Sequence, residues 1–109
     1  MKIRGLISHR SQEGMNRTEA AYAVQLELLQ RGEHLFRWDF QPVKLRLADR
    51  TFYTPDFRVI LCTGEEEYHE VKGFMRDDAA VKIKVAAEQH PYPFFLVQKS
   101  KHGFTKERV

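Results

Sequence analysis

Residues 51–73 read TFYTPDFRVILCTGEEEYHEVKG, and this stretch decides the fold. Residues from about 52 to 61 read as a strand, in which Pro55 is tolerable only near the start or at an edge. Thr63-Gly64-Glu65 has the composition of a turn, and residues 67–72 read as a returning strand. We therefore predict an antiparallel hairpin.

The register of this hairpin brings charged side chains together. Its turn centres near Thr63, so Asp56 falls roughly opposite Glu70. Side chains opposite one another project from the same face, about 5 Å apart. Lys72 lies two residues beyond Glu70 and shares that face because strand side chains alternate, whereas a slip of one residue would separate the carboxylates. The other face is then expected to be the core face and to carry Phe57, Val59, Leu61 and Val71.

Two helices are predicted on either side of the hairpin in the chain. The first covers residues 16–31: Asn16 is a good N-cap, Glu19 follows three residues on as in a capping box, and Gly32 is a suitable C-terminal stop. The second covers residues from Asp77 to about 89.

Alternating apolar residues predict further strands over 36–40 and 43–47, and a short strand over 94–98 follows the second helix. The first strands can form an antiparallel meander. The helical crossover should return the last strand parallel to the one before it. We predict an α/β domain with a mixed central β-sheet flanked by helices.

Composition is that of one globular domain over residues 1–109, with 42% hydrophobic and 30% charged residues. We read residues 1–14 as a basic arm and residues 99–109 as a basic tail. The net charge of +3 leans weakly towards a polyanionic partner.

Cysteine content and hydropathy indicate the compartment. Cys62 is the only cysteine, which excludes an intrachain disulfide and a cysteine-based zinc site and fits a reducing compartment. Charges interrupt the N-terminus too often for a signal-peptide core, and the apolar runs are too short to span a membrane. We expect a cytoplasmic protein with no membrane partner.

The paired acids predict a metal centre. Two carboxylates at that spacing repel each other, and a divalent cation between them removes the conflict; hard oxygen ligands suit Mg²⁺. The Val71 backbone carbonyl, between Glu70 and Lys72, could add a ligand. A metal site of this kind activates water and offsets charge on a phosphate, and the Lys72 ammonium can assist. These parts serve phosphodiester hydrolysis.

The alternatives to this interpretation are ordinary ones. Asp56 alone reads as a strand-start acid, and Glu70 with Lys72 reads as the solvent face of an edge strand; the pairing across the hairpin favours the functional interpretation. Glu19 could bind a second metal or hold a water, but a capping-box glutamate needs no catalysis to explain it.

The chain resembles the PD-(D/E)xK nucleases of the restriction-endonuclease-like fold, and within them the bacteriophage endonuclease I group of Holliday-junction resolving enzymes. The resemblance covers roughly residues 16–98. Its motifs are Thr18-Glu19, Tyr53-Thr54-Pro55-Asp56-Phe57, Glu70-Val71-Lys72-Gly73-Phe74 and Glu88-Gln89-His90-Pro91.

The resemblance implies Mg²⁺-dependent DNA cleavage, with Mn²⁺ able to substitute, in a bacterial or phage-infected cytoplasm. It implies metal ligation by Asp56 and Glu70, help from Glu19 and a catalytic role for Lys72. Branched DNA or a four-way junction is the first expectation for the substrate, and two symmetric cuts would call for a homodimer. This chain is shorter than members of that group and has no extended basic C-terminal region. Its residues 36–57 read as a compact local hairpin, where members of the group exchange elements between subunits, so a swapped dimer and junction specificity stay open.

Three other functions stay open: a sequence- or mismatch-specific nicking or restriction-type endonuclease, a non-catalytic DNA-binding module, and a small structural or assembly protein of a phage particle. Phosphate contacts would come from basic residues near the site elements. The candidates are Arg10, Arg17, Arg76, Lys99 and Lys101. His69 should point to the opposite face from Glu70, and the histidines show no metal-ligand spacing.

Overall fold

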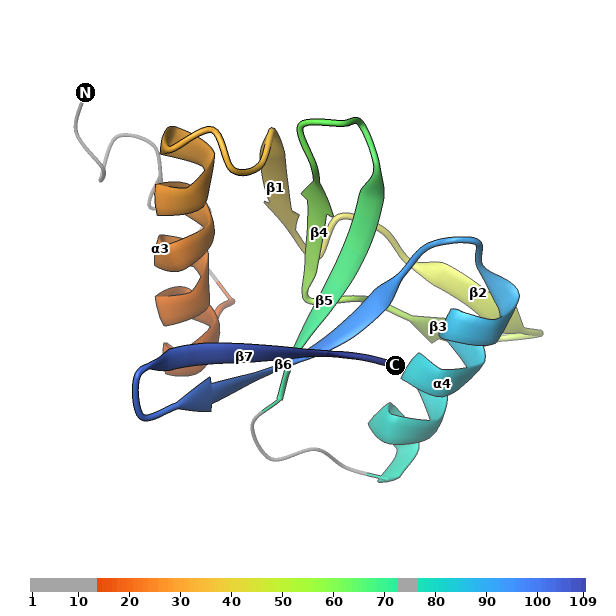
Figure 1. The fold of residues 1–109 in the computed structure, drawn as a ribbon. Coiled ribbons are helices and arrows are strands. Elements are labelled where there is room, and N and C mark those ends of the chain that lie inside the picture. The colour runs from red at the N-terminus through yellow and green to blue at the C-terminus, as the bar shows by residue number, and fades with distance from the viewer. Residues whose placement is uncertain (1–13, 73–76) are drawn as a thin grey trace.

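The computed structural model describes residues 14–72 and 77–109, and Figure 1 shows their arrangement. The predicted basic arm therefore lies, except for Gly14, outside the described residues, as do Arg10 and Arg76. The elements in chain order are α3 (Arg17–Arg31), β1 (Arg37–Phe40), β2 (Leu45–Ala48), β3 (Thr51–Tyr53), β4 (Phe57–Ile60), β5 (Glu66–Lys72), α4 (Asp77–Gln89), β6 (Phe94–Ser100) and β7 (Gly103–Arg108).

The main sheet has five strands in the order β1-β4-β5-β6-β7. Strands β5 and β6 are parallel and joined by α4, while the other neighbours are antiparallel. The predicted mixed sheet and the parallel return through a helical crossover are confirmed. Strands β2 and β3 form a separate two-stranded sheet.

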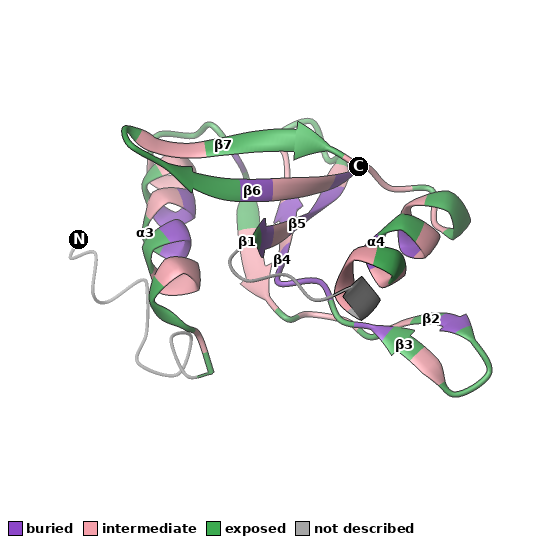
Figure 2. Ribbon diagram, turned by 90° about the horizontal axis from the view of Figure 1, so that it is seen from below, coloured by how far each residue is buried: buried purple, intermediate pink, exposed green. Residues whose placement is uncertain are grey.

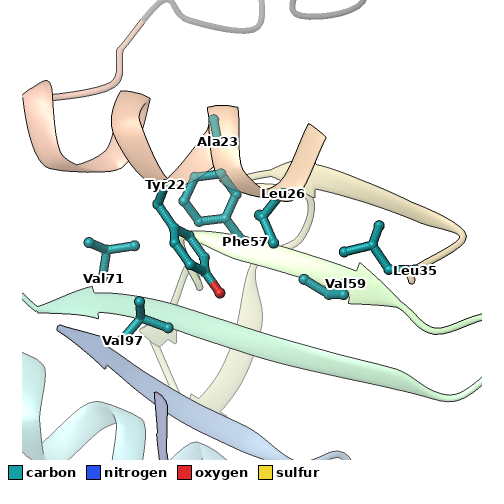
Figure 3. Close-up of a cluster of buried hydrophobic side chains, with 8 residues drawn as sticks. All are labelled: Tyr22, Ala23, Leu26, Leu35, Phe57, Val59, Val71 and Val97. Carbon is teal, nitrogen blue, oxygen red and sulfur yellow. The ribbon is translucent and has the colours of Figure 1, made fainter. Parts of the chain in front are cut away.

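Each face of the main sheet is covered by a different layer (Figures 1 and 2). Helix α3 packs on one face through a buried cluster, drawn in Figure 3, of Tyr22, Ala23, Leu26, Leu35, Phe57, Val59, Val71 and Val97. Helix α4 and the β2–β3 hairpin cover the other face through Leu47, Tyr53, Tyr68, Ile83, Ala86 and Phe94. The α/β fold with helices flanking the sheet is as predicted from the alternation of apolar residues.

Helix α3 begins as its sequence indicates. The Asn16 side chain accepts a hydrogen bond from the Glu19 backbone N–H, with 2.8 Å between the atoms. The Glu19 side chain accepts one in return from the Asn16 N–H at 2.9 Å, which completes the capping box. Gly32 occupies the C-cap, and its N–H donates to carbonyls of the last turn.

The prediction of one continuous strand over residues 52–61 is wrong, because this stretch forms two strands in different sheets. The chain leaves the β2–β3 hairpin after Tyr53 and enters the main sheet only at Phe57. Pro55 lies in the break, and it has no N–H to donate to a neighbouring strand. The predicted meander is also wrong, because β1 pairs with β4 and not with β2.

The last strand is longer than predicted, and the basic tail over 99–109 is mostly strand. Strand β6 continues to Ser100, and β7 pairs antiparallel with it from Ser100↔Gly103 to Phe95↔Arg108. Strand β7 (GFTKER) lies at the edge of the sheet, and its last four residues are polar or charged and exposed, as is typical of an edge strand. In the described part of the chain, no helix is long and apolar enough to cross a membrane.

Candidate active site

The register between β4 and β5 is the predicted one. Phe57 pairs with His69 and Arg58 with Tyr68. Continuing the ladder by one residue places Asp56 opposite Glu70.

Side chains of β5 alternate between the two layers. His69 contacts Tyr22 of α3, whereas Tyr68 packs in the cluster beneath α4. Glu70 and Lys72 therefore share the α4 face, as predicted, and His69 points to the other one. The two acids and the lysine therefore lie at the same end of the hairpin, where β5 ends and β4 begins.

Asp56 closes the end of the β4–β5 ladder with its side chain. Its Oδ2 accepts a hydrogen bond from the Val71 N–H at 2.9 Å, and only 7% of the residue is exposed. The Glu70 carboxylate in turn accepts a hydrogen bond from the Asp56 backbone N–H. The two acids are thus held against each other's backbone.

The Val71 carbonyl faces the same space. The Leu61 N–H donates a hydrogen bond to the Glu65 carbonyl, so Leu61 and Glu65 form a hydrogen-bonded pair of the β4–β5 ladder. Every second pair in an antiparallel ladder is hydrogen-bonded. Counted along the register, Val71 would form such a pair with Pro55. Pro55 has no N–H to donate to that carbonyl. An oxygen with spare acceptor capacity therefore points towards the β4 side, next to the Asp56 carboxylate.

Burial and neighbouring carboxylate charges raise the pKa of both acids. Burial raises the pKa of Asp56 most, the Glu70 charge adds to it, and the value reaches about 8 against an ordinary 3.8, despite the lowering effect of the Val71 N–H. Burial likewise raises the pKa of Glu70, against hydrogen bonds that lower it. A cation between the two carboxylates would remove the cost of ionising both at neutral pH.

Tyr53 is a site residue that sequence reasoning missed. Its hydroxyl donates to Glu70 Oε1 at 2.5 Å and lowers the pKa of that acid. Burial and the Glu70 charge raise the pKa of Tyr53 far above its usual value, so it stays a donor. The available signal was its place in the Tyr53-Thr54-Pro55-Asp56-Phe57 motif, but the contact depends on where β3 leaves the sheet.

Glu19 contacts Asp56 and also caps its own helix. Its charge and a hydrogen bond between the two carboxyl groups help to raise the Asp56 pKa. Its Oε1 is held by the Asn16 N–H in the capping box. Across residues 14–72 and 77–109, no group of three or more histidine, cysteine, aspartate or glutamate side chains is placed to hold a metal ion. Besides Glu19, the protein oxygens at this position are those of Asp56, Glu70 and the Val71 backbone.

Lys72 has an exposed side chain at the last position of β5. Among the described residues it forms no ion pair with either acid. Its ammonium is thus available to an anion that approaches the end of the strand.

Two of the described DNA-contact candidates, Lys99 and Lys101, lie near the end of the sheet at which β5 ends, and the third, Arg17, lies at the start of α3. Arg17 is exposed in the first turn of α3, close to Glu19 in sequence. Strand β6 places Gln98 beside Lys72, so Lys99 lies one residue further along the neighbouring strand, and Lys101 follows in the β6–β7 turn. Both lysines are exposed.

Comparisons of the chain with protein-family models, with curated proteins and with solved structures find no match. The functional argument therefore rests on the geometry of the site and on the motifs of the sequence.

Proposed function

We propose that this protein is a Mg²⁺-dependent DNA endonuclease. The observation that carries the proposal is the pair formed by the buried Asp56 and the half-buried Glu70, which share one end of the β4–β5 hairpin beside an exposed Lys72. Burying two interacting acids costs stability unless a ligand uses them. Sites with such paired, perturbed carboxylates and a nearby cation are typical of phosphoryl chemistry.

The donor set fits a hard divalent cation. Asp56, Glu70 and the Val71 carbonyl offer oxygen atoms only, which Mg²⁺ prefers, and Mg²⁺ keeps waters in its remaining positions. When bound, the ion would supply an activated water and stabilise charge on the phosphate. Tyr53 fixes the orientation of Glu70 through its hydrogen bond. Lys72 offsets charge on the substrate phosphate or orients the attacking water.

Membership of the PD-(D/E)xK superfamily is part of the proposal. Support comes from the mixed sheet with a helix on either face, and from the acids and lysine at the end of its central hairpin. Branched DNA or a four-way junction is the substrate we propose first, on the motif resemblance. A homodimer would then supply the two active sites that paired cuts need.

A cleavage assay tests the proposal. Wild-type protein with Mg²⁺ or Mn²⁺ is mixed with a four-way junction, a linear duplex and single strands, in parallel with Glu70→Gln. Glu66→Gln is the matched control, because Glu66 lies on the same strand at its other end. Junction cutting abolished only by Glu70→Gln supports the proposal, and cutting of linear duplex at a fixed sequence favours the restriction-type alternative.

A non-catalytic DNA-binding module is the second candidate. The observation that favours it is the capping box, in which Glu19 Oε1 already accepts a hydrogen bond from the Asn16 N–H. This candidate predicts DNA binding without cutting in any divalent metal, and equal binding by wild type and Glu70→Gln.

A further inference from the structure

The β2–β3 hairpin has two chemically different faces. Leu47 and Tyr53 are buried in the cluster beneath α4. Arg46 pairs with Phe52 across the hairpin, and both side chains are exposed. Because strand side chains alternate, the exposed pair projects away from the core.

The outer face combines cations with an aromatic ring. The Lys44 ammonium lies 5.2 Å from the centre of the Phe52 ring, and 39% of Phe52 is exposed. Arg50 is exposed at the turn, where Asp49 is the one acid between residues 44 and 53. In the described part of the chain, the three cations of this hairpin form no ion pair. Their charge is therefore available to an external anion.

The hairpin is also tied to the candidate active site. Tyr53 directly follows the exposed Phe52, and its hydroxyl binds Glu70. Figure 2 shows the hairpin and α3 on opposite sides of the β4–β5 pair. The outer face of the hairpin is thus one residue along the chain from a side chain that holds Glu70.

We propose that the β2–β3 hairpin is a DNA-docking surface, in which Lys44, Arg46 and Arg50 contact backbone phosphates. The Phe52 ring offers a flat apolar surface to a sugar or to a base unstacked at a branch point, since ring–base stacking tolerates any sequence. This inference rests on the proposed function and assigns the substrate a contact surface distinct from Arg17, Lys99 and Lys101.

Equilibrium binding without divalent metal tests the surface separately from catalysis. Wild-type protein, Lys44→Gln/Arg46→Gln and Phe52→Ala are titrated with a fluorescent four-way junction at a series of salt concentrations. Each lost phosphate contact should reduce the slope of log affinity against log salt by about 0.9. For the double variant, we expect the magnitude of the slope of log affinity against log salt to fall by roughly two. We expect Phe52→Ala to weaken junction binding and to leave that slope unchanged.

Arg37→Gln and Phe36→Ala are matched controls. Arg37 pairs with Ile60, at the opposite end of β4 from Asp56, and Phe36 is the exposed aromatic residue beside it. Both should bind as wild type does. Circular dichroism of every variant checks folding, and Arg46→Lys should retain the wild-type slope if its charge is what matters.

The outcomes separate the two proposals. If wild type binds and cuts DNA but the hairpin variants match the controls, the docking surface is wrong and the nuclease proposal stands. If wild type neither binds nor cuts DNA, both are wrong. Selective loss in the hairpin variants, together with preserved folding, establishes the surface.

Discussion

The Asp56 carboxylate accepts a hydrogen bond from the backbone N–H of Val71, with 2.9 Å between Oδ2 and N. The side chain thereby takes the place of a main-chain acceptor that β4 would have supplied had it continued through Pro55. One consequence is a satisfied backbone donor at the sheet end. The other is a buried acid held beside Glu70. Ionising both acids without a cation between them lowers the stability of the folded state.

Asp56→Asn should stabilise the metal-free protein at alkaline pH. The pKa of Asp56 is about 8 in the folded chain, against 3.8 ordinarily. Between these values the folded state holds a proton that the unfolded state has lost, so the free energy of unfolding falls as pH rises from about 4 to about 8. Asparagine does not titrate, so the free energy of unfolding of the variant lacks this decrease between about pH 4 and about pH 8. Its Tm at pH 8 should rise by roughly 4–8 °C for each kcal/mol recovered, with no gain below about pH 4.

Thermal unfolding between pH 3.5 and 8.5 in chelator measures this effect. Asp49→Asn, at an exposed acid in the β2–β3 turn, is the control and should leave the pH profile unchanged. An Asp56→Asn protein that is no more stable than wild type at pH 8 would show that Asp56 is not strained by its burial.

Tyr53→Phe should weaken Mg²⁺ binding at neutral pH without unfolding the protein. The hydroxyl lowers the Glu70 pKa, so its removal raises that pKa and increases competition by protons. A hydrogen bond to a charged group contributes about 1.5–3 kcal/mol, which corresponds to roughly tenfold or more in affinity. The deficit should shrink as pH rises.

Calorimetric titration with Mg²⁺ at pH 7 and at pH 9 checks this dependence. Tyr68→Phe is the matched control, because Tyr68 donates to Glu66 on the same strand, away from the site. Equal losses in the two variants would assign the effect to packing and not to the Glu70 contact.

Lys72→Met should abolish most cleavage and preserve metal binding. Losing one group that stabilises charge in the transition state typically costs about 10²–10³ in rate. The exposed side chain contributes little to the core, so the fold should persist. Single-turnover cleavage rates and Mg²⁺ titrations of Lys72→Met, beside Lys84→Met on α4, provide the comparison. Unchanged cleavage would remove Lys72 from the mechanism.

Tyr22→Phe should destabilise the fold through a buried network behind the site. The Tyr22 hydroxyl and His69 Nδ1 lie 2.6 Å apart, and His69 Nε2 contacts Glu67 at 2.7 Å, which Lys106 also reaches. Removing the hydroxyl leaves a buried ring nitrogen without its partner, at a cost of about 1–3 kcal/mol.

Urea unfolding of Tyr22→Phe, with Tyr92→Phe as control, measures that cost from the midpoint at constant slope. A Tyr22→Phe protein as stable as wild type would mean that His69 finds another partner or none is needed.

Local signals predicted the parts of this fold that depend on neighbouring residues. Asn16, Glu19 and Gly32 mark the ends of α3 because caps satisfy the helix's own backbone. The turn near Thr63 fixed the alignment of Asp56 with Glu70, since alternation and turn position determine hairpin register.

Tertiary contacts decided what could not be predicted. The break between Tyr53 and Phe57 depends on the β2–β3 hairpin leaving the main sheet to pack on α4, through contacts distant in sequence. The Tyr53–Glu70 contact follows from that break. Strand β7 was also missed, because an exposed edge strand with alternating charges has the composition of a tail.

Anomalous diffraction from crystals grown with Mn²⁺ tests the central claim most directly. We predict a Mn²⁺ peak between the Asp56 and Glu70 carboxylates, at about 2.0–2.3 Å from their oxygens and within reach of the Val71 carbonyl, and its loss in Glu70→Gln. Well-ordered crystals of wild-type protein in saturating Mn²⁺ with no peak at this position would contradict the account.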